Sequence, residues 1–389
     1  MTNNMSGNIK LLLKSAGSFF LAGFFVFSTA CSKGPEEEPD TPPENEPGLP
    51  QVRTAGVADV TDEGATVSCV LVSDGGKILL ERGVVYGTEE NPTLETGTKV
   101  NASRGTGEYS VELGNLSDWK GYHVRAFATN KLGTSYGEDM AFETLPKTVR
   151  TINLDGVVFK MVYVEGGTFR MGAADDDATA ESYEKPAHNV TLDSYYIGSC
   201  EVTNEVWNMV MEGRAPTPLE QNERFKPVGL KSWPQCVEFI DKISKQTGMN
   251  FSLPTEAQWE YAARGGNRQE HYLYCGSDEL DEVGWYYANA ESNVMIVGTK
   301  KPNGLGLYDM TGNVLEWCAD WYGQYSAQDQ ENPVCDVENP EGFRVMRGGS
   351  VVNDPGWCRL THRFGGKFDS NMYFVGFRLV LNKNKQESA

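Results

Sequence analysis

Hydrophobic and polar positions alternate in short segments along the first half of the chain. Turns rich in Gly, Asp and Asn separate four such segments, which span 65–72, 81–86, 109–113 and 123–128. A period of two residues is typical of a strand with one buried face, and strands of this length and spacing are typical of a sandwich of about seven strands. The pattern therefore predicts an all-β sandwich over residues 51–146.

Helix signals replace this alternation in residues 152–382. Thr203 is a predicted start of one helix, and Ser232 starts a second helix whose apolar residues recur at i, i+3, i+4 and i+7. Thr255 and Gln258 form a capping box at the start of a third. The rest of this region is rich in glycine and tryptophan and only weakly periodic. We therefore expect an α+β domain with long ordered loops.

The first 30 residues resemble a targeting segment. Two lysines precede the apolar run 19–27, and small residues lead to Cys31. This is the layout of a secretory signal peptide, and the run is shorter than the ~20 residues that a membrane span needs. A cysteine at the first mature position resembles the bacterial lipobox, which implies cleavage before Cys31 and its lipidation. Plain secretion and a membrane span are the alternatives.

Residues 31–50 are acidic, rich in proline and almost free of apolar side chains. Such a segment cannot bury enough apolar surface to fold, so we predict a disordered tether. Acidic residues soon after a lipidated cysteine resemble the surface-export signal of Bacteroidetes lipoproteins. This implies anchoring at the outer membrane or cell surface, with a periplasm-facing orientation or a plain linker as alternatives. Residues 383–389 are expected to be a short tail.

The overall charge argues against some classes of partner, and the cysteine pattern argues against some classes of site. The net charge is −20, which argues against nucleic acid, because phosphate binding needs clusters of Lys and Arg. It also disfavours adsorption to anionic lipid, so anchoring falls to Cys31. The other seven of the eight cysteines contain no CxxC pair, so neither a zinc knuckle nor a thioredoxin-like motif is indicated. An odd number leaves at least one thiol free unless it pairs between chains.

Within the predicted sandwich, the segment 116–126 (LSDWKGYHVRA) resembles the E–F corner of a fibronectin type III-like domain. In that family a tyrosine hydroxyl bonds back to the chain, and Tyr122 occupies this position. The sequence of the predicted sandwich shows no cluster of candidate acids, bases or nucleophiles. We expect a spacer module, with carbohydrate binding as the alternative.

Five segments of the second region, taken in their order along the chain, point to one protein family. They are GGTFRMG (166–172), EVTN (201–204), LPTEAQWE (253–260), PNGLGLYDMTGNVLEW (302–317), and RGGS (347–350) with GFRL (376–379). Together they resemble the formylglycine-generating enzyme, or sulfatase-modifying factor, family over all of 152–382. The resemblance implies a loop-rich α+β fold that is a variant of the C-type-lectin-like fold.

The resemblance also implies an oxidase that converts a substrate cysteine to formylglycine with two thiols that bind Cu(I). Cys358 matches the second thiol position after the Gly-Gly-Ser turn, but Asn353 stands at the first. A neutral amide is a hard ligand and does not replace a thiolate for Cu(I). We therefore expect neither copper binding nor oxidase activity, and Cys358 is then a small buried hydrophobe. In an oxidase, Cys358 and Ser350 would be the catalytic residues.

Calcium is the cofactor that the resemblance implies. The first site would use two carboxylates and two main-chain carbonyls, from Asp309, Gly312, Val314 and Glu316. Calcium prefers hard oxygen ligands, and loops often alternate side-chain and carbonyl donors. Asn289 and Ala290 match the first two donors of a second site, whose remaining segment is shortened. The alternative is that Asp309 only caps a turn and Glu316 is solvated.

Functions of different classes follow from these features. The first is an envelope lipoprotein with a non-catalytic binding or scaffold role and a protein or glycan ligand. The alternatives are a formylglycine-generating oxidase that acts on sulfatase cysteines, and a component of an envelope secretion or gliding complex. The amide at Asn353 favours the first.

Overall fold

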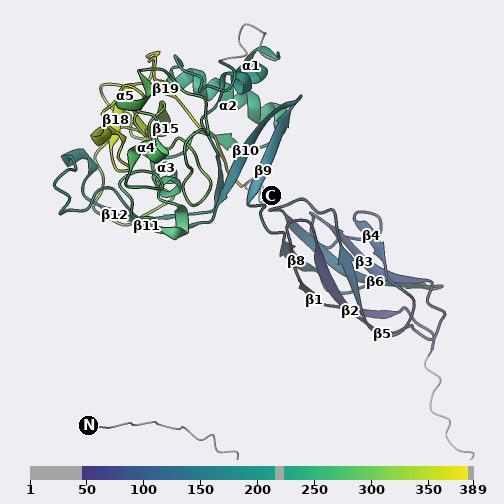
Figure 1. The fold of residues 1–389 in the computed structure, drawn as a ribbon. Helices are drawn as coiled ribbons and strands as arrows, with labels where there is room; N and C mark the ends of the chain where they lie inside the picture. Colours follow the sequence, from purple (N-terminus) through teal and green to yellow (C-terminus); the bar gives the residue numbers. More distant parts are fainter. Residues whose placement is uncertain (1–45, 215–222, 384–389) are drawn as a thin grey trace, which may run out of the picture. The chain divides into compact units, whose positions relative to one another are not determined.

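The computed structural model describes residues 46–214 and 223–383 (Figure 1). The predicted signal peptide, Cys31, most of the tether and the tail from 384 lie outside the described residues. The described residues from Gly48 onward belong to one compact unit. In the described ranges, no helix is long and apolar enough to cross a membrane.

Residues 51–143 form two antiparallel sheets around one apolar core, and all four alternating segments are strands, as predicted. The first sheet has the order β1-β2-β5, with β1 (Gln51–Ala58), β2 (Ala65–Ser73) and β5 (Gly107–Leu113). The second has the order β4-β3-β6-β7, with β8 paired to β6. Its strands are β3 (Glu81–Gly87), β4 (Thr98–Asn101), β6 (Gly121–Asn130), β7 (Gly133–Tyr136) and β8 (Met140–Glu143). The buried residues of both sheets share this core, among them Val67, Val84, Val111 and Val124.

The chain enters and leaves this module at opposite ends. Asn130, the last residue of β6, donates its side-chain amide to the Gly48 carbonyl at 2.8 Å. Glu143, the last residue of β8, pairs with Gly121 at the start of β6. The ten residues of β6 span about 30 Å at ~3.3 Å per residue. The module thus separates its first and last residues by about that length.

Residues 149–381 contain three sheets of shorter strands. The first has the order β14-β20-β13-β10-β9, the second β11-β12-β16 and the third β18-β17-β15-β19. The strands of the first are β9 (Val149–Leu154), β10 (Val157–Val164), β13 (Tyr195–Gly198), β14 (Phe251–Ser252) and β20 (Val380–Leu381). Those of the second are β11 (Gly167–Met171), β12 (His188–Leu192) and β16 (Gln330–Glu331). Those of the third are β15 (Leu315–Trp321), β17 (Phe343–Arg347), β18 (Arg363–Lys367) and β19 (Val375–Gly376).

The three predicted helix starts are confirmed. The helices of the described residues are α1 (Asn204–Glu212), α2 (Trp233–Thr247), α3 (Glu256–Ala263), α4 (Leu280–Val283) and α5 (Tyr287–Ala290), with 3-10 turns at 182–184, 266–268 and 355–358. Thr203 caps α1 by accepting the Val206 N–H. Ser232 and Thr255 cap α2 and α3 in capping boxes. Local caps therefore set all three helix starts.

Candidate functional site

The turn at residues 309–314 is sharply bent. Asp309, Gly312 and Asn313 have φ angles of 54°, 83° and 60°, all in the left-handed region. A Cβ on Gly312 would lie 2.2 Å from the Trp285 carbonyl oxygen, so only glycine fits at this approach. The turn leads directly into β15, which carries Glu316.

Two buried carboxylates near this turn each keep one oxygen without a hydrogen-bond partner. Asp309 Oδ2 accepts the Gly298 N–H at 2.6 Å, and Glu201 Oε1 accepts the Asn313 side-chain amide at 3.0 Å. Asp309 Oδ1 and Glu201 Oε2 have no partner in the described structure, although the two residues are only 1% and 3% exposed. A buried oxygen without a partner is costly. Each is therefore a candidate donor to a cation.

The charges around these oxygens favour a cation as well. Burial raises the pKa of Asp309 to about 6, even though the Gly298 N–H and Arg378 oppose the change. Burial, and then the charges of Asp309 and Glu316, raise the pKa of Glu201 well above its ordinary value. A divalent cation would remove this repulsion and let both carboxylates ionise. The residues present thus fit calcium, which prefers such hard oxygen ligands.

Glu316 is fully buried, so the alternative that it is solvated is wrong. Arg378 donates to both of its oxygens, at 2.5 and 2.6 Å, and Trp259 Nε1 donates to Oε2 at 2.7 Å. A carboxylate accepts about four hydrogen bonds, so one acceptor position remains. In the described ranges no three His, Cys, Asp or Glu side chains form a metal-binding group. Main-chain carbonyls, such as those predicted at Gly312 and Val314, would have to complete a calcium shell.

Asn289 and Ala290, the predicted start of a second calcium site, lie in α5. Asn289 Oδ1 accepts the Tyr286 N–H at 2.9 Å, and its amide donates to Asp281 and to the Gly284 carbonyl. The side chain therefore caps α5. The second calcium site stays a prediction.

The predicted thiol position is enclosed. Cys358 is fully buried in a small apolar cluster with Tyr274, Leu280 and Val283. Burial raises the pKa of its thiol to about 12, so the thiol is protonated at neutral pH. Burial therefore disfavours the thiolate, which is the form that binds metals and attacks substrates.

Asn353 completes the turn that precedes Cys358. Ser350 Oγ bonds to Asn353 Oδ1 at 2.7 Å, and the Asn353 N–H donates to the Ser350 carbonyl at 3.0 Å. The residue at the first thiol position therefore holds the turn closed with two hydrogen bonds. Ser350 is fully buried, and its hydroxyl hydrogen is donated to Asn353 Oδ1.

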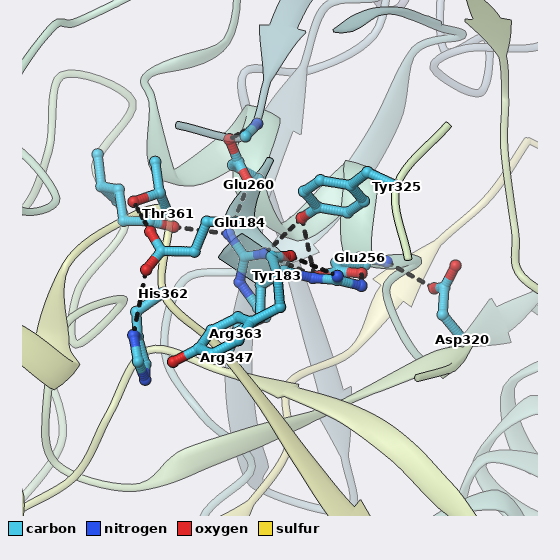
Figure 2. A network of polar contacts seen from close by, with 12 residues as sticks. Tyr183, Glu184, Glu256, Glu260, Asp320, Tyr325, Arg347, Thr361, His362 and Arg363 are labelled. Atoms are coloured by element: carbon cyan, nitrogen blue, oxygen red, sulfur yellow. Dashed lines mark hydrogen bonds and ion pairs between the residues drawn. The ribbon is translucent and has the colours of Figure 1, made fainter. Parts of the chain in front are cut away.

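A second group of buried carboxylates is neutralised by arginines (Figure 2). Arg347 donates to Glu256 at 2.7 Å and to Glu260 at 2.6 Å. Arg363 donates to both oxygens of Glu256. The Tyr325 hydroxyl donates to Glu256 Oε1 at 3.0 Å. Burial alone would raise the pKa of Glu256, but the two guanidinium groups lower it to about 2. This network ties α3 to β17 and β18.

The network continues to Glu184, also drawn in Figure 2. Arg359 and Thr361 donate to its carboxylate, and His362 Nδ1 lies 3.5 Å from Glu184 Oε1. His362 therefore faces a carboxylate. This contact gives it a structural place in the network.

Glu201 is the member of the carboxylate group that sequence reasoning missed. Its one signal was its position in the EVTN segment, two residues before the helix cap Thr203, and Asn313 lies 112 residues further along. The structure places Glu201 within electrostatic range of both Asp309 and Glu316. It places Cys358, Ser350 and Asn353 on another turn, which is joined to the 309–314 turn by backbone hydrogen bonds from Gly312 to Gly348 and from Val351 to Asn313.

Comparisons with known proteins agree with the order of the five segments. Residues 153–383 match the family described as sulfatase-modifying factor enzyme 1-like domain. The chain is 32% identical over 276 residues to a chaperone protein LppX of Paenibacillus barcinonensis, covering 57% of this chain and 89% of that protein. It is 30% identical over 290 residues to the formylglycine-generating enzyme of Thermomonospora curvata, covering 57% and 93%.

Solved structures show the same fold. Treponema denticola variable protein 1 is 26% identical with a TM-score of 0.55, over 61% of this chain and 100% of that one. PvdO from Pseudomonas aeruginosa is 23% identical with a TM-score of 0.54, over 61% and 99%, and supports the fold alone. Because the family match spans more than half of the chain, this protein belongs to the sulfatase-modifying factor enzyme 1-like family.

Proposed function

We propose that this protein is an envelope lipoprotein whose family domain has a non-catalytic binding or scaffold role. The observation that carries the proposal is the turn at Cys358. Its thiol is buried and protonated, and the position of a second thiol is occupied by Asn353, which bonds to Ser350. Two soft thiolates are what Cu(I) requires. The relative named a chaperone protein is consistent with a role other than oxidation.

The arrangement of modules supports a platform held away from the membrane. Lipidation of Cys31 would anchor the chain to the outer membrane or cell surface, facing either side. The sandwich would be a fibronectin type III-like spacer. Its support is the strand order and the Tyr122 hydroxyl, which accepts the Ser117 N–H at 2.9 Å as expected for that corner. The second domain, as a variant of the C-type-lectin-like fold, would present its loops to a protein or glycan ligand.

Calcium is the proposed cofactor of this platform. Glu201 and Asp309 would hold it with the carbonyls of Gly312 and Val314, and Glu316 would supply charge and one remaining acceptor position. The ion would contribute positive charge among buried carboxylates. Because Glu201 precedes α1 and Asp309 precedes β15, these side chains would link the two segments through it.

The test of the non-catalytic role is a direct assay for oxidation. The purified full-length protein is incubated with Cu(I), oxygen and a peptide that contains a CxPxR motif, and the peptide mass is followed. We expect no conversion of the cysteine to an aldehyde, while an active formylglycine-generating enzyme converts the same peptide in parallel. Copper-dependent conversion by this protein would overturn the proposal in favour of the oxidase.

Anchoring is tested separately. The Cys31→Ser variant should lose lipidation and leave the membrane fraction of the cell, because one thiol carries the proposed anchor. Retention of a normally processed Cys31→Ser protein in the membrane pellet would refute the lipoprotein part alone.

A further inference from the structure

Large apolar side chains are exposed at the end of the sandwich where the described chain begins. We call this surface the apolar tip. It consists of Leu49, Ile78, Leu80 and Leu132, with exposed fractions of 49%, 73%, 42% and 53%. Scattered single apolar residues on a surface need no explanation, but a cluster on neighbouring loops does.

Hydrogen bonds hold the segments of the apolar tip together. The Gly48 N–H donates to the Gly75 carbonyl at 2.9 Å, and the side-chain amide of Asn130 donates to the carbonyls of both Gly48 and Asp74. The Leu80 N–H donates to the Thr129 carbonyl at 2.8 Å. A Cβ on Gly133 would lie 3.0 Å from a methyl group of Leu49. Residues 48–49, 74–80 and 130–133 therefore form one continuous surface.

The loops at this end carry more exposed cations than carboxylates, although the whole chain carries −20 and the exposed Glu46 lies two residues before Gly48. Loops 74–80, 102–106 and 131–132 carry exposed cations at Lys77, Arg104 and Lys131. Their one carboxylate, Asp74, accepts the Gly76 N–H at 2.8 Å. Arg82 holds the loop 102–106 at this end through the carbonyls of Ser103 and Gly105. Exposed apolar side chains with cations on neighbouring loops suit the interface of an anionic bilayer.

We infer that the apolar tip docks onto an anionic phospholipid bilayer. Ile78, Leu132 and their neighbours would enter the interface, and the three cations would lie at the headgroup phosphates. This inference deepens the proposed function and rests on the anchor at Cys31. The 17 residues from Cys31 to Gly48 (48 − 31) span about 50 Å as extended polyproline II, so the anchor allows the tip to reach the membrane.

Docking would orient the sandwich as well as hold it. The chain leaves the sandwich at Glu143, paired with Gly121 at the far end of β6. With the tip on the bilayer and β6 directed away from it, the start of the second domain would lie about 30 Å from the lipid surface. The overall negative charge disfavours adsorption elsewhere on the chain, which helps to select this one orientation.

The test uses the full-length lipidated chain in vesicles of phosphatidylethanolamine and phosphatidylglycerol. Amide hydrogen exchange is measured for residues 76–80 and 131–133, with and without vesicles, in the wild type and in a chain that carries Ile78→Asp and Leu132→Asp. Val337→Asp is the matched control, because Val337 is 75% exposed in the second domain. We expect vesicles to slow exchange of both loops by about tenfold in the wild type and in the control, and the tip variant to lose this protection.

A second arm measures the contribution of charge. The full-length Cys31→Ser protein is floated with the same vesicles, and Lys77→Glu with Lys131→Glu should lower the bound fraction by about tenfold at low salt. Equal binding of the two proteins would overturn the role of the cations.

Two results would overturn the inference while leaving the anchor intact. In the first, the wild type remains on vesicles through its lipid, but both loops exchange as fast as in solution. In the second, the loops become protected without vesicles as protein concentration rises, which would show that a second copy covers the tip. Failure of the anchor looks different, because the wild type and Cys31→Ser would then bind vesicles equally.

Discussion

Two buried carboxylates of the second domain, Glu256 and Asp309, have pKa values shifted in opposite directions. Glu256 has a pKa of about 2, because Arg363 and Arg347 outweigh the cost of burial. Burial raises the pKa of Asp309 to about 6, and Arg378, which is paired with Glu316, opposes this change only in part. Both side chains are almost completely buried, so the difference lies in the number of cations that the chain itself supplies. Glu256 is neutralised by arginines of the chain itself, whereas the proposed calcium ion would supply the charge that Asp309 lacks.

The largest effect should come from removing a cation that neutralises Glu256. Arg347→Met leaves Glu260 and part of Glu256 buried without their partner, and we expect the free energy of unfolding to fall by about 3–5 kcal/mol. Chemical denaturation followed by tryptophan fluorescence measures it, because seven of the eight tryptophans lie after residue 151. Arg170→Met, on the exposed side of β11, should change stability by less than about 0.5 kcal/mol. Equal stability of both variants would contradict the comparison.

Acid should remove the stabilisation that Glu256 provides, without any mutation. The pKa of Glu256 is lowered from 4.5 to about 2 in the folded state, so its stabilisation is complete above pH 4.5 and disappears as pH falls toward 2. The difference corresponds to about 3 kcal/mol. Unfolding curves between pH 7 and pH 2.5 should show this loss, and Glu256→Gln should flatten the slope. An unchanged slope in Glu256→Gln would assign acid sensitivity to other groups.

The proposed site at Asp309 should respond to calcium. At a hundredfold excess over its dissociation constant, an ion that binds only the folded state adds about 2–3 kcal/mol to stability. Chelation should therefore lower the melting temperature of the second domain, and magnesium should restore it poorly because it requires a smaller octahedral shell. Glu201→Gln should remove most of the calcium-dependent change, whereas Glu331→Gln, on an exposed strand, should keep it.

The informative outcome for calcium is a difference between variants. Glu316→Gln should destabilise the domain with or without calcium, because it weakens the Arg378 pair. The proposed site would be contradicted if the melting temperature stayed the same with calcium and with a chelator shown to strip bound ions.

The smallest effect on stability is expected at the thiol turn. Asn353→Cys loses the hydrogen bond to Ser350 Oγ and should change stability by no more than about 1 kcal/mol. A second thiol on this turn should nevertheless raise affinity for Cu(I), measured by competition with a copper chelator. Asn353→Ser also removes the amide oxygen that accepts from Ser350 Oγ, but it adds no thiol, so it is the control. Identical copper affinities would show that Cys358 remains inaccessible even to a paired ligand.

Sequence patterns were sufficient where structure depends on nearby residues. Thr203, Ser232 and Thr255 mark helix starts because each caps the N–H groups of the following turn. Strands β2 and β5 follow from alternation, because each has one face in a shared core, whereas β3 buries four consecutive residues, 82–85. The order of five motifs was enough to identify the family.

The arrangement of charges was beyond such patterns. The matched segments contain both Glu256 and Arg347, but these residues are 91 positions apart, and no local periodicity connects them. Glu201 has no partner in its own segment, and only the folded turn at Asp309 gives it a role. Pairings of this kind depend on how loops cross in space, which the residue spacing of a single sequence does not encode.

The opposite positions of Gly48 and Glu143 in the sandwich have a mechanical consequence. A pull between an anchor before Gly48 and a ligand held by the second domain would act along the strands. Hydrogen bonds between antiparallel strands run perpendicular to them, so this force would load the β1–β2 bonds in shear, all together. A chain that entered and left at the same end would open them one by one under much lower tension. In the proposed lipoprotein, the module would therefore transmit force as well as set distance.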